Sequence, residues 1–560
     1  MDELSFPREG FRRPAFQNLG AYLLVLVVAG LLFFARLRSP LLEPEDAFYA
    51  EVPRQMLAGG EWLIPTHEDR PFYQKPPLLY WLIMASYSVF GVHDWAARLV
   101  PCFAGLGIVL VTFWWGKRLL DLRTGLTGAL ILCLSARFVH QTRMITMDGL
   151  LCFWILCGLA LGQQAVQSQK FRWRLWLLSA ACCGLGMLTK GPVALILVAV
   201  PIFVYQIFDR RTARPGAWSW PAYLGTALGL ALPWYLAVAW RIPDFAHEFL
   251  WNHHVVLRFV QPLHDQPVWY YLPTLLLGML PWTLLMPGLI KLLLRRFSAG
   301  DGKTPAEVWF LLGCCSWCLL FYSMAPCKRI GYILPAMPTF ALALGYTLDR
   351  RLSGQGLWVF CRRCESSLSY WSTHAVLGTA TIFAIAAGIA DLIGPGRCMA
   401  LTALGCAAIA GLVVGRRIRE NSATRGLAGS WAGCALAAFA FLFVAVHVLL
   451  PGYYRKFSLR AQVQSFQDCP QIPVVCHPHH CDSVSFYLGR RDIRSYSRDE
   501  RDRLIAELSG RPETIVFVKT GQVLNDLLQQ LPDSLEFIPR GRASWMTAGL
   551  VRRRTITATR

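Results

Sequence analysis

The sequence predicts an α-helical protein that crosses a membrane many times and ends in a small α/β domain. Three observations support this fold class. Of the 560 residues, 55% are hydrophobic and only 16% are charged. Many apolar runs approach the length of about 20 residues that crosses a bilayer as a helix. Charge is also uneven, since 28 of the last 109 residues are charged, against 61 of the first 451. The tail therefore has the composition of a soluble domain, and the rest does not.

This composition excludes several classes of protein. A soluble enzyme or a disordered chain would not contain so many long apolar runs. The net charge of +21 could suggest nucleic acid as a partner. In a membrane protein, however, an excess of Lys and Arg usually reports orientation, so no nucleic-acid partner is inferred.

Thirteen apolar segments are predicted to span the membrane. They cover residues 20–37, 95–116, 124–140, 149–166, 173–188, 191–208, 219–240, 269–293, 306–324, 331–349, 373–393, 398–415 and 429–450. The first follows Arg8, Arg12 and Arg13 and precedes no small-residue cleavage site, so we expect an uncleaved anchor.

Lys and Arg in alternate connecting segments predict the orientation. Seven alternate segments carry 24 of them, whereas the four short loops on the other side carry five. The rich side is predicted to be cytoplasmic, which places the N-terminus inside and the tail outside. We expect a multi-pass protein of the cytoplasmic membrane.

Two long segments, 38–94 and 241–268, fall on the outer face, where long loops can hold chemistry. Within the first, Pro76–Gly91 is apolar but short for a span, which predicts a helix lying at the membrane interface. We therefore predict a membrane domain over 1–451 and an outer α/β domain over 452–560. In the latter, PVVC and TIVFVKT are strand-like, and RDERDRLIAEL is helical.

The predicted topology gathers polar residues on the outer side of the membrane. They are Glu45, Asp46, Glu51, Arg54, Lys75, Arg143, Asp148, Lys190, His253, His254, Arg258, His264, Lys328, Arg329 and Tyr332. Such a group could hold an anionic lipid headgroup while a carboxylate acts as a general base.

Each of these residues also has a simpler interpretation. A single Lys or Arg at a membrane edge is more often an interfacial anchor. Asp148 could be a helix N-cap, and Glu45 and Asp46 could be acids at a helix start. His253 and His254 could be polar residues of an exposed loop. The prediction of a site therefore depends on the whole set lying on one side.

Several motifs resemble a known family. The run PEDAFYAEVPRQMLAGGEWLIPTHEDRPFYQKPPLLYW resembles the first outer loop of the bacterial aminoarabinose (4-amino-4-deoxy-L-arabinose) transferases of lipid A. These belong with the protein O-mannosyltransferases to the GT-C membrane glycosyltransferases. Later segments follow in the family's order: WAARLVP, RMITMDGLL, LTKGPVALIL, HHVVLRFVQPLHDQPVWYYLP and KRIGYILPAMP. The resemblance covers roughly residues 15–350, and implies a GT-C architecture.

The resemblance implies roles for individual residues. The family's leading catalytic carboxylate falls on Glu45, with Asp46 as its rival because the usual Asp–Glu order is swapped. Its second acidic position falls on Asp148. Its phosphate-binding cations fall on Arg54, Lys75 and Arg258, with Tyr332 near the phosphate. We add Lys190 and Lys328 to this donor-phosphate set, and His253, His254 and His264 as residues near an acceptor or a metal.

Two positions depart from the family's pattern. Pro53 replaces a residue that is usually helical, so the helix is expected to kink before Arg54. Gln74 stands where relatives often have an acid that could help to bind a divalent metal. No cofactor is therefore required, although a divalent metal stays open.

The implied reaction transfers a sugar from a polyprenyl phosphate to an acceptor on the outer face, with inversion. A loop-one carboxylate would serve as base, and cations would stabilise the departing phosphate. The acceptor is left open between a lipid A-like lipid, a glycan and a protein. The alternative is a transporter, flippase or binding protein for lipid-linked sugars, although a transporter would place charges near mid-membrane. The tail could be a sugar-binding module.

Two cysteine motifs lie apart from these residues. CRRC, at Cys361 and Cys364, lacks a second ligand pair, which argues against zinc. In the tail, CHPHHC runs from Cys476 to Cys481, and a Cys476–Cys481 disulfide or a bare loop is favoured over a metal site. Three histidines so close in sequence do not easily converge on one ion.

Overall fold

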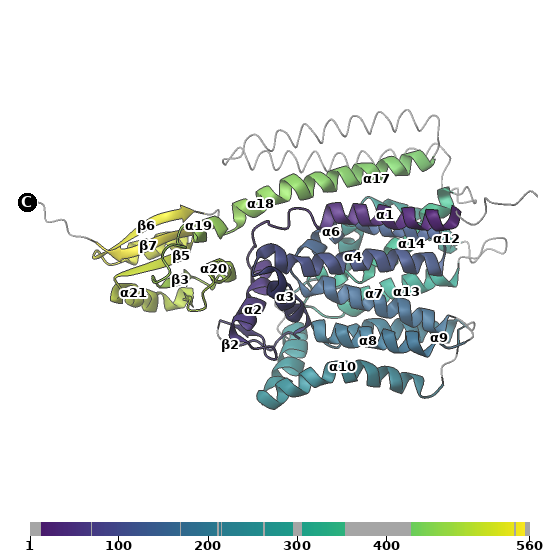
Figure 1. Ribbon diagram of the computed structural model, residues 1–560, viewed down its shortest axis with the longest axis horizontal. Helices are drawn as coiled ribbons and strands as arrows, with labels where there is room; N and C mark the ends of the chain where they lie inside the picture. Colours follow the sequence, from purple (N-terminus) through teal and green to yellow (C-terminus); the bar gives the residue numbers. More distant parts are fainter. Residues whose placement is uncertain are drawn as a thin grey trace, which may run out of the picture. The chain divides into compact units, whose positions relative to one another are not determined.

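The computed structural model describes residues 13–352 and 427–554, apart from 69, 168–169, 210–211, 214–215, 261–263, 295–304 and 543–544. The chain forms two compact units (Figure 1). The first comprises residues 1–35, 74–78 and 101–449, and the second comprises 36–73, 79–100 and 450–560. The tail thus shares a unit with most of the first outer loop. The predicted boundary near residue 452 coincides with one edge of this unit, and the division into 1–451 and 452–560 stays a prediction.

Helices make up the first unit. They are α1 (Arg13–Phe33), α4 (Asp94–Leu119, whose first turns belong to the second unit), α5 (Leu122–Cys133), α6 (Ala136–Arg143), α7 (Met147–Val166), α8 (Trp173–Lys190), α9 (Val193–Phe208), α10 (Ser219–Arg241), the π-helix η1 (His247–Val260), η2 (Val268–Tyr270), α11 (Tyr271–Gly278), η3 (Trp282–Leu285), α12 (Met286–Leu294), α13 (Ala306–Ser323), η5 (Ile330–Ile333), α14 (Ala336–Leu352), α17 (Leu427–Val444) and η6 (Ala445–Leu449). Figure 1 shows α7, α8 and α10 running alongside one another.

The chain is a multi-pass membrane protein. Among the described residues, five helices are long and apolar enough to cross a bilayer, or up to seven if each of two bent pairs is one span. The bent pairs are α5 with α6, at 67°, and η2–α11 with η3–α12, at 97°. Each overlaps one predicted span, 124–140 or 269–293, and extends slightly beyond it at both ends. The predicted spans 373–393 and 398–415 lie outside the described residues, so the count of thirteen stays a prediction.

Small residues allow helices of the first unit to pack closely. A Cβ added at Gly345 of α14 would lie 2.6 Å from the backbone nitrogen of Gly128 in α5, nearer than any real side chain approaches. Close approach through glycine replaces the hydrophobic driving force that lipid does not provide between helices. This contact holds α14 against α5.

The first outer loop supplies the N-terminal part of the second unit. It forms α2 (Glu45–Gly59), the hairpin β1 (Thr66–His67) and β2 (Arg70–Pro71), and α3 (Leu78–Phe90). Helix α3 occupies the segment that we predicted as an interfacial helix. Helix α2 has both acids in its first turn, where they suit the helix dipole. Gly60, with a φ of +68°, caps its C-terminal end. Helix α2 continues through Pro53.

The tail forms the rest of the second unit. Its elements are α18 (Leu450–Phe457), α19 (Arg460–Gln464), β3 (Val474–His477), α20 (Asp482–Leu488), β4 (Arg494–Ser495), η7 (Arg498–Glu500), α21 (Arg501–Gly510), β5 (Glu513–Lys519), α22 (Gln522–Gln530), β6 (Leu535–Arg542) and β7 (Met546–Arg553). The strands form one sheet in the order β4-β3-β5-β7-β6. Strands β3 and β5 cover the two strand-like segments of the sequence, and they pair in parallel.

Alternation along the strands places a core on each face of this sheet. Val474, Cys476 and Phe517 pack with residues of α19 and α20. Val475 and Val516 point to the other face and pack with residues of α21 and α22. Because both faces are covered by helices, the strands read as continuous apolar runs.

Candidate functional site

Three of the predicted site residues meet in the first unit. Asp148 is the second residue of α7, and Lys190 is the last residue of α8. The Lys190 ammonium forms an ion pair with the Asp148 carboxylate. The same ammonium lies 4.1 Å from the centroid of the Tyr332 ring, an attractive cation–π distance. Asp148 is therefore not the N-cap, a position that Thr146 occupies, and its side chain serves this cluster instead.

Gly331 is closely packed against this cluster. A Cβ at Gly331 would overlap Oδ2 of Asp148 and lie 3.3 Å from Nε2 of Gln141. Gln141 is buried, and its Nε2 donates a hydrogen bond of 3.0 Å to the Thr146 hydroxyl. Gln141 was not singled out in the sequence, although it lies two residues before the RMITMDGLL motif. The cluster thus consists of a carboxylate, an ammonium, an aromatic ring and an amide.

Other cations of the first unit bind backbone carbonyls. Lys328 is buried, and its ammonium donates to the carbonyl oxygens of Gln266 at 2.9 Å and Ala325 at 2.6 Å. Burial lowers the pKa of Lys328. Arg143 donates to the last carbonyls of α1, those of Leu32 and Phe33. Both side chains therefore fix loops or helix ends, as cations at helix C-termini do.

The remaining predicted residues of the first unit are Lys75, His264 and three residues of η1. Lys75 is half-buried. His264 is exposed, and its Nε2 lies 3.2 Å from a guanidinium nitrogen of Arg329. The backbones of His253, His254 and Arg258 lie in η1, and their side chains are outside the described residues.

The two acids that open α2 have different environments. Asp46 is only 2% exposed, and its Oδ2 accepts a hydrogen bond of 2.8 Å from Arg98 in a buried ion pair. Arg98 also donates to the carbonyls of Leu37, Ser39 and Pro40. Asp46 thus belongs to a network that fixes the chain entering α2. Glu45 is half-buried. Arg98 was not singled out in the sequence, although it lies in the WAARLVP motif.

Arg54 also makes buried contacts. Its guanidinium binds both carboxylate oxygens of Glu51, each at 2.6 Å, and donates to the carbonyl of Arg490 at 2.9 Å. Burial raises the pKa of Glu51, against the lowering effect of Arg54. A bidentate pair of this kind favours a role for Arg54 in fixing α2 over a role in phosphate binding.

Glu43, just before α2, is a half-buried acid whose contacts the sequence did not reveal. Its Oε1 accepts a hydrogen bond of 2.6 Å from the backbone nitrogen of Ser483. Burial, aided by the negative charge of Asp482, raises the pKa of Glu43 to about 8. The carboxyl group is therefore largely protonated at neutral pH, and it connects the start of α2 to the tail.

The CHPHHC segment carries no disulfide. Cys476 and Cys481 are both buried free cysteines. The three histidines do not converge, as expected from their spacing. His477 Nδ1 lies 2.9 Å from the carbonyl oxygen of Tyr496, and His479 stacks on Trp545. His480 contacts residues of the first outer loop instead.

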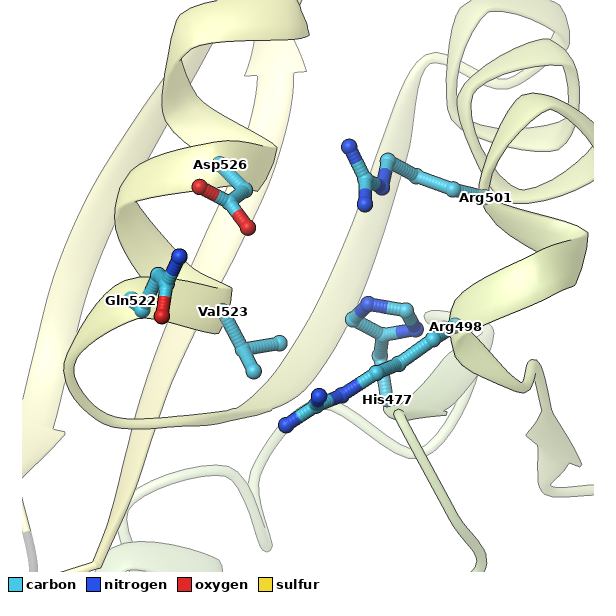
Figure 2. Close-up of a pocket in the computed structure, with 6 residues that line it drawn as sticks. All are labelled: His477, Arg498, Arg501, Gln522, Val523 and Asp526. Carbon is cyan, nitrogen blue, oxygen red and sulfur yellow. The ribbon is translucent and has the colours of Figure 1, made fainter.

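Two hollows lie among the described residues, but none of the predicted site residues lines either of them. One, of 120 Å³, lies in the tail between α21 and α22 and is lined by His477, Arg498 and Arg501 among others (Figure 2). It is smaller than the several hundred Å³ of an ordinary ligand site. The other, of 630 Å³, is an apolar groove between the C-terminal part of α9 and α13. Lys190 precedes α9, at the end of that helix away from the groove.

Comparison with known proteins confirms the resemblance seen in the motifs. The family described as dolichyl-phosphate-mannose-protein mannosyltransferase matches residues 45–249. The undecaprenyl phosphate-alpha-4-amino-4-deoxy-L-arabinose arabinosyl transferase of Aeromonas salmonicida is 33% identical over 313 residues, which are 55% of this chain and 56% of that protein. That of Erwinia tasmaniensis is 31% identical over 309 residues, 54% and 55% of the two chains. The match thus spans about half the length of these curated relatives.

A solved structure has the same fold over nearly the whole chain. ArnT from Cupriavidus metallidurans, solved bound to undecaprenyl phosphate, superposes with a TM-score of 0.74 at 20% sequence identity. The superposition covers 97% of this chain and 98% of that one. The fold is therefore shared beyond residue 350, where the motifs end.

Proposed function

We propose that this protein is a glycosyltransferase that moves a sugar from a polyprenyl-phosphate donor to an acceptor on the outer face of the cytoplasmic membrane. The observation that carries the proposal is the similarity to the mannosyltransferase family over 45–249. This stretch contains Glu45, Asp148 and Lys190, and the last two form an ion pair. The arabinosyl transferases that match this chain support a donor built on undecaprenyl phosphate.

The proposed reaction is an inverting displacement at the anomeric carbon. Glu45 takes the proton of the acceptor hydroxyl as the acceptor oxygen forms its bond to that carbon. The bond from the anomeric carbon to the phosphate oxygen breaks, and polyprenyl phosphate leaves with the electron pair. We assign the base to Glu45 because the family's leading catalytic carboxylate falls on this residue, whereas Asp46 forms a buried pair with Arg98. A positioned base of this kind contributes about 10²- to 10⁴-fold in rate.

Cations stabilise the phosphate as negative charge develops on it. Lys75 and Arg258 are assigned to this role by their motifs. Lys190, Asp148 and Tyr332 form a fixed cluster, in which Asp148 orients Lys190 and the ring supports the ammonium. Arg54 and Lys328, which bind Glu51 and backbone carbonyls, are assigned to positioning.

The number of membrane spans and their orientation are part of the same proposal. Thirteen spans would place the N-terminus in the cytoplasm and both the first outer loop and the tail outside. A lipid-linked donor suits that side, because nucleotide sugars are cytoplasmic. A lipid A-like lipid or a glycan is proposed as acceptor, ahead of a protein.

The experiment that tests this function uses the full chain purified in detergent with a panel of radiolabelled polyprenyl-phosphate sugars. We expect the wild type to bind at least one of them and to transfer its sugar to a membrane extract. Lys75→Ala is expected to weaken donor binding, whereas Lys117→Ala, in the last turn of α4 at its predicted cytoplasmic end, serves as the matched control. Binding without transfer to any lipid, glycan or protein fraction would support a transporter or binding protein instead.

A further inference from the structure

Four metal-ligating side chains gather in the second unit, apart from the residues of the proposed reaction. His67 and Glu68 lie at the tip of the β1–β2 hairpin, and His480 and Asp482 lie at the start of α20. Ligand atoms of His67, Glu68 and His480 all lie within 4.8 Å of one another. Asp482 Oδ1 is 2.7 Å from His67 Nε2 and 3.7 Å from His480 Nε2.

The His480 ring supplies a second observation that points to a bound cation. Its side chain is only 9% exposed, and Nδ1 has no hydrogen-bond partner among the described residues. This nitrogen lies 3.9 Å from Oε1 of Glu68. The opposite nitrogen, Nε2, lies 3.1 Å from the Ser485 hydroxyl. A buried nitrogen left unsatisfied destabilises the fold, and a bound cation would relieve this cost.

We propose that His67, Glu68 and His480 bind one divalent transition-metal ion, for which Zn²⁺ is the best match. Two imidazoles and a carboxylate are a common zinc ligand set, with a fourth position for water. Asp482 lies beside both rings, where it acts as the carboxylate that orients them. Zinc ligands sit about 2.0–2.2 Å from the ion, so the cluster must contract on binding. Glu68, 39% exposed at the hairpin tip, is the ligand with room to move inward.

The ion would fasten the first outer loop to the tail. His67 packs edge-on against Phe48 of α2, at 4.9 Å between ring centroids. On the other side, Ser483 follows Asp482 and donates its backbone N–H to Glu43, two residues before Glu45. The site is thus connected from two directions to the start of α2. It does not involve Gln74, the position at which the family resemblance left a metal open.

The test measures Zn²⁺ binding to the full chain in detergent after treatment with a chelator. Isothermal titration is expected to give one strong site in the wild type. Co²⁺ in its place should give visible ligand-field absorption from a low-symmetry site. His67→Ala/His480→Ala is expected to weaken binding by at least 100-fold, and Asp482→Asn by about 10- to 100-fold. His479→Ala, which changes the neighbouring histidine that stacks on Trp545, should leave binding unchanged.

Two outcomes would overturn the proposal. One is a wild type without a stoichiometric site, or a double variant that binds as tightly. The other is loss of binding in Cys476→Ser/Cys481→Ser together with retention in the histidine variant, which would assign the ion to the thiols. Unfolding temperatures without metal separate a lost ligand from a lost fold. Since metal binding is read without any transfer assay, its failure is distinct from failure of the proposed function.

Discussion

The two units hold their candidate catalytic residues in different ways. In the first, Asp148 and Lys190 lie at the ends of α7 and α8, which are consecutive helices packed together. In the second, α2 carries Glu45 and is held by residues more than 400 positions later in the chain, including Ser483 and Arg490. The tail is therefore a structural support of the first outer loop, and not only an attached module.

Deleting residues 452–560 is the strongest test of this comparison. We expect transfer to be abolished and the first outer loop to become sensitive to protease, because Glu43 and Arg54 both lose partners in the tail. Limited proteolysis followed by mass spectrometry measures the effect. Deleting only residues 555–560 is the matched control. A truncated protein with a protease-resistant loop and altered acceptor choice would instead favour the tail as a sugar-binding module.

The buried pair of Asp46 and Arg98 gives the next largest effect. Asp46→Asn leaves the Arg98 charge without its counter-ion, which we expect to destabilise the second unit by about 3–5 kcal/mol. Thermal unfolding in detergent measures the loss. Glu45→Gln, which changes the neighbouring half-buried acid, should lower the unfolding temperature by much less. If both substitutions lowered the unfolding temperature equally, Asp46 would not be the acid that stabilises the second unit more.

In the first unit, Gly331→Ala tests the packing around Asp148. The added methyl group would overlap the carboxylate and displace it from Lys190. We expect transfer to fall by about 100-fold, since displacements near 1 Å in an active site have effects of that size. Donor binding and transfer are measured together. Gly313→Ala, where a Cβ meets nothing within 4 Å, is the control. Unchanged transfer would exclude Asp148 from the reaction.

The smallest expected effect is the pH dependence contributed by Glu43. Because its pKa is raised to about 8, the folded protein retains a proton that the unfolded chain loses near pH 4.5. This contribution is complete below pH 4.5 and is lost as the pH rises towards about 8. Glu43→Gln should therefore reduce the fall in unfolding temperature over this range. An identical pH profile in both proteins would contradict the burial of this carboxyl group.

The sequence predicted the parts of the molecule that follow from local patterns. Apolar runs located α7, α10 and α13, and the short run at Pro76–Gly91 located α3, because hydropathy is a local property. Motifs located Asp148, Lys190 and Tyr332, which the structure brings together. The bends between α5 and α6 and between α11 and α12 were not predicted, since an apolar run does not specify its direction.

Residues defined by distant partners could not be predicted. Glu43 and Arg98 acquire their importance from Ser483 and Asp46, and nothing in their own neighbourhoods indicates burial. The motif that assigned Arg54 to phosphate also gave no sign of its pair with Glu51. For the same reason, CHPHHC alone did not indicate that His480 faces His67 in the first outer loop.

The role of Glu45 as the base of the sugar transfer is the core of the proposed function. It is tested most directly by measuring donor binding and transfer together for Glu45→Gln in protein with an unchanged unfolding temperature. We predict that donor binding is retained while transfer falls by about 10²- to 10⁴-fold. Transfer at the wild-type rate in this variant would contradict this role.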